Sequence, residues 1–390
     1  MTGRSAIQLV RKETQGKRLK GTLWLDMWRQ FRRHRMATAG LAIFISFFVV
    51  AVLGVVLTTG PEPLLNPSLV RLPEKLRPPM AAPRAELLQP GDLPVLGIYV
   101  LGTDDLGRDV FARMMQGAWV SLTVGFVAVG IAVGIGILLG GISGYYGPVP
   151  VMLGHMLAVI GLGGGAIGAL AGHSALALGL AAMGAASLGL LARTGRWKGN
   201  RAQPLARWLA LPCFSVDTLV MRLVDIMLCF PSFFLILTVV ALLPASIYNI
   251  MVVIGLTSWM GTTRLVRAEF LALREQDFVA AAQALGVPAR RIIFRHLIPN
   301  AIAPVLVSAT LGIGGAIMTE AALSFLGFGV PPPHATWGNI FSDGKRFIFD
   351  APWLTFLPGI AVLVVVLAFN LFGEGLRDVL NPRLRERRSV

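Results

Sequence analysis

Charge is scarce in this chain. Only 14% of its 390 residues are charged, whereas 55% are hydrophobic, and the mean hydropathy is +0.70. Soluble globular domains carry about 25% charged residues. The composition is therefore typical of neither a soluble globular protein nor a disordered chain, and it indicates an integral membrane protein.

Cysteine is nearly absent as well. Cys213 and Cys229 are the two cysteines, and both lie in or beside apolar segments. A disulfide framework or a metal cluster is not expected from such usage. Because free cysteine is often simply buried, we expect both to be packing residues.

Catalytic motifs are also missing. The sequence has no GxxxxGK[S/T] loop for ATP and no HExxH zinc motif, and its five histidines are scattered. Gly163, Gly165 and Gly168 have the GxGxxG spacing, but no strand precedes them and no acid follows at the right distance. Small residues four apart, such as Gly161 and Gly165, instead favour close helix packing in lipid. We expect no enzyme activity, no cofactor and no metal site in this chain.

Long apolar runs divide the chain into membrane spans. The run 37–57 has about the twenty apolar residues that a spanning helix needs. The basic segment before it, 1–36, has apolar residues at helical spacing, which predicts an amphipathic helix on the inner membrane surface. The proline-rich stretch 58–116 has balanced charge and suits an extracytoplasmic loop. Further spans are expected at 118–143, 221–243, 247–266, 300–319 and 353–372, within the core segments 117–147 and 216–390.

One segment, 148–215, interrupts this order. It contains two more apolar runs, 151–171 and 174–192, and an even number of added crossings preserves the orientation of everything downstream. The segment 193–207 then carries basic residues without an acid, as cytoplasmic loops do. We expect an all-α polytopic bundle of six core and two inserted spans with both termini cytoplasmic. The role of the insert stays open, with a peripheral helical hairpin as the working hypothesis.

The net charge of +15 raises the alternative of a nucleic-acid partner. The lysines and arginines, however, lie in the N-terminal tail, between apolar segments and at the C-terminus instead of on a soluble basic domain. Attraction to anionic lipid head groups and retention of loops in the cytoplasm account for this distribution. Membrane lipids, and not nucleic acid, are the expected partner of these charges.

The most informative stretch is a polar, arginine-bearing interruption between two apolar segments. Asp277 is suited to cap a helix over 278–285, Gly286 to end it in the left-handed conformation, and Pro288 to begin the next helix. The alanines of the first helix have small side chains, so another protein could approach its backbone. An ordinary basic loop is an equally good reading of the physics alone. The candidate docking residues are Asp277, Ala280, Ala281, Ala282, Gly286, Arg290, Arg291, Pro299 and Asn300.

This stretch, 267–299, resembles the EAA loop of ABC-importer permeases, whose pattern is Glu-Ala-Ala, three residues, Gly and an Ile/Leu-Pro ending. Ala281, Ala282 and Gly286 match the pattern, whereas Ala280 stands where the family usually has glutamate. That departure leaves open the strength of the ATPase contact. Four other segments are similar to the second permease chain of dipeptide and oligopeptide importers: 101–126, 216–235, 320–339 and 352–383.

The resemblance implies the type I ABC-importer transmembrane fold in the bacterial inner membrane. It implies a transport subunit that pairs with a homologous second permease, two ATPase subunits that bind ATP and Mg, and an extracytoplasmic substrate-binding protein. Peptides are the expected solute, and nickel chelates or other small solutes are the alternative. A secondary transporter or a membrane scaffold would have the same hydropathy, but a secondary transporter needs intramembrane carboxylates or broken helices, and few candidates appear.

Residues for a solute pathway are harder to identify. Pro231 removes a helical hydrogen bond and should kink the span 221–243. The hydroxyls in 257–263 would suit a pathway or bonds to neighbouring helices equally well. The TDDLGRD segment, 103–109, is expected to be structural, with a cap and ion pairs at helical spacing. The possible pathway residues are Pro231, Thr257, Ser258 and Thr262.

Overall fold

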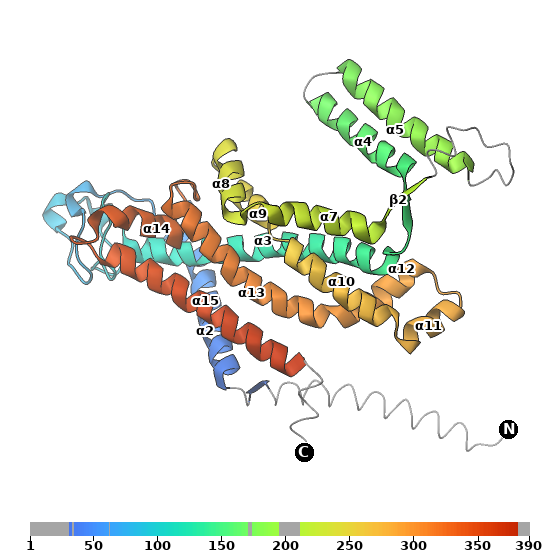
Figure 1. The fold of residues 1–390 in the computed structure, drawn as a ribbon. Coiled ribbons are helices and arrows are strands. Elements are labelled where there is room, and N and C mark those ends of the chain that lie inside the picture. Colours follow the sequence, from blue (N-terminus) through green and yellow to red (C-terminus); the bar gives the residue numbers. More distant parts are fainter. Residues whose placement is uncertain (1–30, 33–34, 62, 171–173, 195–210, 381–390) are drawn as a thin grey trace, which may run out of the picture. The chain divides into compact units, whose positions relative to one another are not determined.

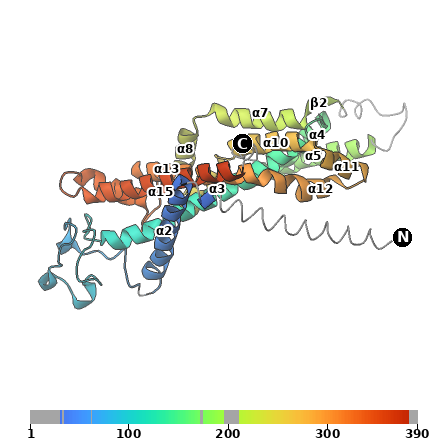
Figure 2. The same cartoon turned by 90° about the horizontal axis from the view of Figure 1, so that it is seen from below.

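The computed structural model describes residues 31–32, 35–61, 63–170, 174–194 and 211–380, and helices dominate it (Figure 1 and, turned by 90°, Figure 2). Most of the predicted amphipathic segment 1–36 and of the basic loop 193–207 lies outside these residues. The chain forms two compact units: Met1–Gly136, Phe230–Leu265 and Ile298–Val390 make up unit 1, and Ile137–Cys229 and Val266–Leu297 make up unit 2.

Unit 1 is a bundle of apolar helices. Helix α15 packs along both α2 and α13, and Phe44 of α2 lies 5.1 Å from Phe369 of α15 between ring centroids. Gly40 permits this approach, because a Cβ there would lie 2.8 Å from the backbone nitrogen of Phe372. Its helices are α2 (Arg35–Thr58), the first part of α3 (Val110–Tyr146), α8 (Ser232–Leu242), α9 (Ile247–Leu256), the start of α10 (Met260–Arg274), α13 (Ile298–Phe325), α14 (Trp337–Gly344) and α15 (Trp353–Leu380).

The proline-rich stretch between α2 and α3 has little regular structure. It contains short 3₁₀ turns at Leu72–Glu74, Ala85–Leu87 and Pro90–Asp92 and isolated bridges. Tyr99 is fully buried within it, and burial raises the pKa of its hydroxyl to about 12. Helix α3 begins at Val110, earlier than the apolar run predicted, because the Asp109 carboxylate accepts the Phe111 N–H at 2.8 Å and caps the helix.

Unit 2 carries the inserted hairpin and the polar loop. The hairpin consists of α4 and α5, which lie side by side in Figure 1. A Cβ on Gly161 would lie 2.7 Å from the Gly184 nitrogen, so glycine allows the two helices to touch. The elements of unit 2 are the end of α3, β1 (Pro150–Met152), α4 (Leu153–Leu170), α5 (Ser174–Thr194), β2 (Pro212–Ser215), α7 (Val216–Cys229), most of α10, α11 (Asp277–Ala284), α12 (Ala289–Ile292) and a π-helical turn (Ile293–Leu297).

A small antiparallel strand pair closes the base of the hairpin, an element that the sequence did not predict. Pro150 pairs with Ser215 and Val151 with Phe214. These pairs bring the two ends of the insert together. The Gly163 spacing lies inside α4, so the strand that a dinucleotide fingerprint requires is replaced by a helix.

The polytopic helical bundle is confirmed, and the spans can be compared one by one. By length and composition, four helices of the described residues can cross a membrane: α2, α3, the continuous segment Ala289–Phe325, and α15. Helices α7 and α8 together make a fifth, broken candidate, whereas α9 and the apolar parts of α4 and α5 are shorter. The expected total of eight crossings is therefore not reached by this criterion, and it stays a prediction.

Two expected spans are interrupted. The span predicted over 221–243 stops at Cys229 and resumes at Ser232, with Pro231 immediately before the new helix. The expected kink is thus a break. The span predicted over 247–266 is also two helices, because α9 ends at Leu256 and α10 begins at Met260. The N–H of Thr257 bonds back to Val253 and Ile254, which closes α9.

Candidate functional site: the α11–α12 loop and its supports

The helix–turn–helix expected around Gly286 is present. Helix α11 spans Asp277–Ala284, and Gly286 has φ +73°. The Val287 N–H donates to the Ala282 carbonyl at 3.0 Å and the Gly286 N–H to the Gln283 carbonyl at 2.9 Å. These two bonds form a Schellman motif, which ends a helix with glycine in the left-handed region. A Cβ on Gly286 would meet nothing within 4 Å, so conformation and not space requires glycine there.

The expected N-cap of α11 was off by one residue. Gln276 occupies the cap position without a side-chain hydrogen bond, and Asp277 is the first helical residue. A carboxylate in the first turn still interacts favourably with the helix dipole, although it makes no cap bond. Pro288 stands at the cap of α12, next to its first residue, Ala289.

Most of the candidate docking residues are on the surface. Ala282 is the exception, because it is buried on the inner side of α11 with Val279. The exposed members are Asp277, Ala280, Ala281, Gly286, Arg290, Arg291, Pro299 and Asn300. The structure thus brings 277–291 together as one helix–turn–helix on the surface of unit 2. Pro299 and Asn300 lie apart from it, in the first turn of α13.

Three large apolar side chains on the same loop escaped the sequence reasoning. Phe278, Leu285 and Phe294 are 41%, 83% and 65% exposed. Burial of a Leu or Phe side chain is worth about 1.5–3 kcal/mol, so these residues offer binding energy to a partner surface. The sequence does contain one signal for such a residue, because the apolar Leu285 stands immediately before the helix-ending Gly286.

A partly buried ion pair of unit 2 lies on the helix that leads into the loop. The Arg267 guanidinium of α10 donates to both oxygens of Asp217 in α7, with Nη2 to Oδ2 at 2.6 Å. Ser143, near the end of α3, donates to the same carboxylate at 2.6 Å. Phe270 packs against Gly144 of α3, whose Cβ would lie 2.5 Å from the Phe270 Cβ. Helices α3 and α7 therefore both contact α10, which runs directly into the loop.

The possible pathway residues do not gather into one lining. The Thr257 hydroxyl donates to the Val253 carbonyl at 2.8 Å, and Ser258 donates to Ile254 at 2.7 Å. These hydroxyls donate to carbonyl groups of their own helix. Thr262 is buried against Gly136 of α3, whose Cβ would lie 2.6 Å from Thr262 Cβ.

An open cavity of about 600 Å³ lies elsewhere in unit 1, at the end of α2 and the starts of α3 and α9. Among the described residues its lining mixes apolar and polar side chains, and it contains one histidine, His334, but no Asp, Glu, Lys or Arg. Trp119 and Tyr248 contribute partly exposed aromatic rings. Other lining residues include Thr58, Gln116, Thr123 and His334, and none of Pro231, Thr257, Ser258 or Thr262 is among them.

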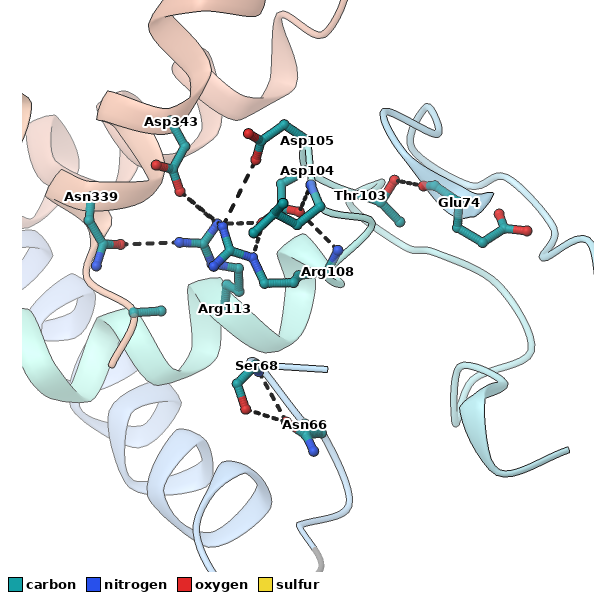
Figure 3. Close-up of polar contacts among 12 residues, drawn as sticks. Asn66, Ser68, Glu74, Thr103, Asp104, Asp105, Arg108, Arg113, Asn339 and Asp343 are labelled. Atoms are coloured by element: carbon teal, nitrogen blue, oxygen red, sulfur yellow. Dashed lines mark hydrogen bonds and ion pairs between the residues drawn. The ribbon is translucent and has the colours of Figure 1, made fainter. Parts of the chain in front are cut away.

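The TDDLGRD segment forms a structural ion-pair network, as Figure 3 shows. Buried Arg113 donates to Asp104 at 2.5 Å and to Asp343 of α14 at 2.9 Å. Arg108 donates to Asp104 at 2.7 Å, as expected from their spacing. Of the two ion pairs that helical spacing allowed, Asp104 with Arg108 forms, whereas Asp109 caps α3 and Arg113 pairs with Asp104.

Burial affects two acids of this segment. The pKa of Asp109 is raised by burial, and the Phe111 N–H bond only partly offsets the rise. The pKa of Asp105 is raised by burial and then by the neighbouring carboxylates of Asp104 and Asp343. The segment therefore contains acids whose charged form is costly to hold.

Comparison with known proteins agrees with this architecture. Residues 202–386 match the family model of the binding-protein-dependent transport system inner membrane component, and residues 22–79 match the N-terminal transmembrane domain of oligopeptide transport permease C. Most of the inserted hairpin lies between the two matches.

Relatives of known type align along nearly the whole chain. The chain is 34% identical to the dipeptide transport system permease protein DppC of Alkalihalophilus pseudofirmus over 93% of this chain and 90% of the relative. It is 31% identical to DppC of Haemophilus influenzae over 93% and 95%. It is 29% identical to the oligopeptide transport system permease protein OppC of Bacillus subtilis over 94% and 91%.

The helical bundle, with several helices long and apolar enough to cross a membrane, defines a polytopic membrane protein. Together with the comparisons, it shows that the chain belongs to the family of binding-protein-dependent ABC-importer permeases, in the branch related to DppC and OppC.

Proposed function

We propose that this permease carries peptides across the inner membrane as one half of an ATP-driven importer. The relatives named for dipeptide and oligopeptide transport support peptides as the solute. A homologous second permease would complete the pathway, and an extracytoplasmic binding protein would deliver the solute. Nickel chelates or other small solutes are the alternative, because specificity commonly resides in that binding protein.

The observation that carries the proposal is the exposed loop between α11 and α12. Ala280 and Ala281 present small side chains, so the backbone of α11 is open to another protein. Leu285 is 83% exposed beside the Schellman turn at Gly286. A partner ATPase that buries Leu285 gains apolar contact, and Arg290 and Arg291 add positive charge to the next turn.

Coupling would run through the clamp beside α10. When two ATPase subunits bind ATP and Mg and close, they displace the loop, and α10 moves with it. Because Arg267 holds Asp217 of α7 and Ser143 holds the same carboxylate from α3, those helices would follow. ATP-driven closure must favour one of two global states for such coupling to operate.

Entry of the solute would use uncharged surface. The cavity of about 600 Å³ lined by Trp119, Tyr248 and neutral hydroxyls suits a peptide, which presents both amide groups and apolar side chains. The break at Pro231 supplies a point at which the two helices could change their angle. The basic residues around both termini support a cytoplasmic position for them.

Purification of the tagged chain from its native membrane in mild detergent, followed by mass spectrometry, tests the proposed assembly. We expect P-loop ATPases and a second permease to co-purify. A variant with Leu285→Asp should recover less ATPase but the same amount of second permease, since only the loop contact is changed. Reproducible recovery of a folded chain without either partner would support a self-contained carrier or scaffold instead.

A further inference from the structure

A glutamate is buried in α13 without a basic partner among the described residues. Glu320 has no exposed surface. Ser324, one turn further along α13, donates to its Oε1 at 2.7 Å. Ser121 of α3 donates to Oε2 at 3.5 Å, and the Thr336 side chain lies within interaction range of the carboxyl group. A carboxylate within a membrane bundle is costly, so packing alone does not account for glutamate here.

The hydroxyls around Glu320 are oriented by other bonds. Thr336 Oγ1 accepts the Asn339 N–H at 3.0 Å in the capping box of α14. Ser121 Oγ accepts the Trp337 N–H at 3.3 Å. Since backbone N–H groups already use an acceptor position on each oxygen, each hydroxyl can direct its proton to the glutamate. Glu320 thereby joins α13 to α3 and to the first turn of α14.

Helix α14 is held closely at this point. Trp337 is buried, and its Nε1 donates to the Met114 carbonyl of α3 at 3.2 Å. A Cβ on Gly338 would lie 2.7 Å from the Cα of Ala321, so α14 touches the backbone of α13 beside Glu320. The far end of α14 reaches Arg113 through Asp343. Helix α14 thus connects α13 to the start of α3.

The chain itself connects α13, on which α14 packs, to the α11–α12 loop. Residues Ala289–Phe325 form one continuous helical segment, which begins with the basic turn of that loop and ends five residues after Glu320. For the proposal that follows, a displacement applied to the first turn would have to be carried along this helix. Whether α14 follows depends on the bonds that hold it to α13.

We propose that Glu320 is a positioning residue that fastens α14 to α13, so that the segment 326–352 moves with α13 when the loop is displaced. The proposal rests on the coupling role proposed above. Glu320 acts through Thr336 and Ser121 and touches no solute. Loss of the carboxylate would leave the loop and the ATPases intact while the movement of α14 is released from that of α13.

The test uses the assembled transporter in proteoliposomes, with Glu320→Gln and Thr336→Val as variants. Thr336→Ser is the matched control, because it keeps the hydroxyl that Thr336→Val removes. We expect both variants to lose at least tenfold in ATP-driven uptake, with basal ATPase activity within twofold of the unchanged chain, and Thr336→Ser to stay near it. The double variant should be no worse than Thr336→Val alone, since Thr336→Val already breaks this connection together with the cap of α14.

Amide hydrogen exchange over 334–344 provides a readout that does not depend on the solute. We expect faster exchange in Glu320→Gln than in the unchanged chain without nucleotide, and a response of this segment to ATP only in the unchanged chain. Unchanged uptake and exchange in Glu320→Gln would overturn the proposal. So would a parallel fall in uptake, basal ATPase and thermal stability, which marks a purely structural role. If no variant and no unchanged complex transports peptide, the proposed function fails, whereas the nucleotide-free exchange still decides whether Glu320 fastens α14.

Discussion

Two single residues of this permease, Gly286 and Asp109, each combine a backbone role with a second property. Gly286 is required for its positive φ, and its surroundings are empty. Asp109 is required as a cap, and its burial makes the charge costly. A pair of substitutions at each position can separate the backbone role from the effect of bulk at Gly286 and of charge at Asp109.

At Gly286, alanine and arginine impose the same backbone strain, about 1–2 kcal/mol for a left-handed residue. Only arginine adds bulk to the proposed docking surface. We expect Gly286→Ala to retain most ATP-driven uptake, and Gly286→Arg to reach the membrane but uncouple ATP hydrolysis from uptake. The measurement is the ratio of solute transported to ATP hydrolysed in proteoliposomes. Normal transport by Gly286→Arg would defeat the assignment of this loop.

At Asp109, asparagine keeps the acceptor oxygen but removes the charge, whereas alanine removes both. We expect Asp109→Ala to lose about 1 kcal/mol, the usual worth of a helix cap. Because the folded-state pKa of Asp109 is raised, the unchanged chain loses stability as pH rises from the ordinary aspartate value through the raised one. Asp109→Asn should therefore be relatively more stable at neutral pH than in acid.

Thermal unfolding of the purified chain in detergent at several pH values measures this difference. Asp105 is the internal comparison, because its pKa is also raised by burial and it remains in both proteins. A gap between Asp109→Asn and the unchanged chain that is constant from acid to neutral pH would show that the charge of Asp109 plays no part in stability.

At the scale of elements, the α11–α12 loop is the proposed contact surface for the ATPases. Its Schellman turn fixes the position of Leu285, and Leu285 protrudes where α11 ends. We expect Leu285→Ala to weaken ATPase binding by about tenfold, which corresponds to roughly 1.4 kcal/mol. Phe349→Ala is the control, since Phe349 is 97% exposed but lies in unit 1, between α14 and α15.

Titration of purified ATPase onto the permease pair in nanodiscs would give both affinities. Equal loss in the two variants would mean that exposed apolar residues in general, and not this loop, govern the association.

Elements also show how far sequence reasoning reaches. Apolar runs found α2, α3, α13 and α15, because lipid-spanning helices need a length that sequence displays directly. The glycine turn was found because left-handed backbone has a residue preference. The clamp between Asp217 and Arg267 was missed, since its partners are 50 positions apart and no local spacing links them. Glu320 was missed for the same reason, because Ser121 lies 199 positions away.

At the scale of the whole molecule, the inserted hairpin is set apart by its own construction. Its helices pack on each other through Gly161 and Gly184, and the pairing of Pro150 with Ser215 brings its ends together. The apolar runs predicted the two helices, but not the strand pair, which is too short to give a periodic pattern. A unit closed at its base can be removed without stretching the chain.

We expect replacement of 151–214 by a short Gly-Ser linker to leave the permease assembled and able to transport. The control is an equal linker inserted after Gly189 in the intact chain. Co-purification of the second permease and ATP-driven uptake are the two readouts. An assembled complex without uptake would argue that the hairpin takes a direct part in transport.

The central claim is that this chain moves peptides when separate ATPases act on its α11–α12 loop. The most direct measurement is uptake of labelled di- and oligopeptides into proteoliposomes that hold the complete complex, with the binding protein outside and ATP available to the ATPases. We predict uptake that requires ATP and disappears in Gly286→Arg while ATP hydrolysis continues. Uptake that proceeds without ATP, or that an ion gradient alone drives, would contradict the account.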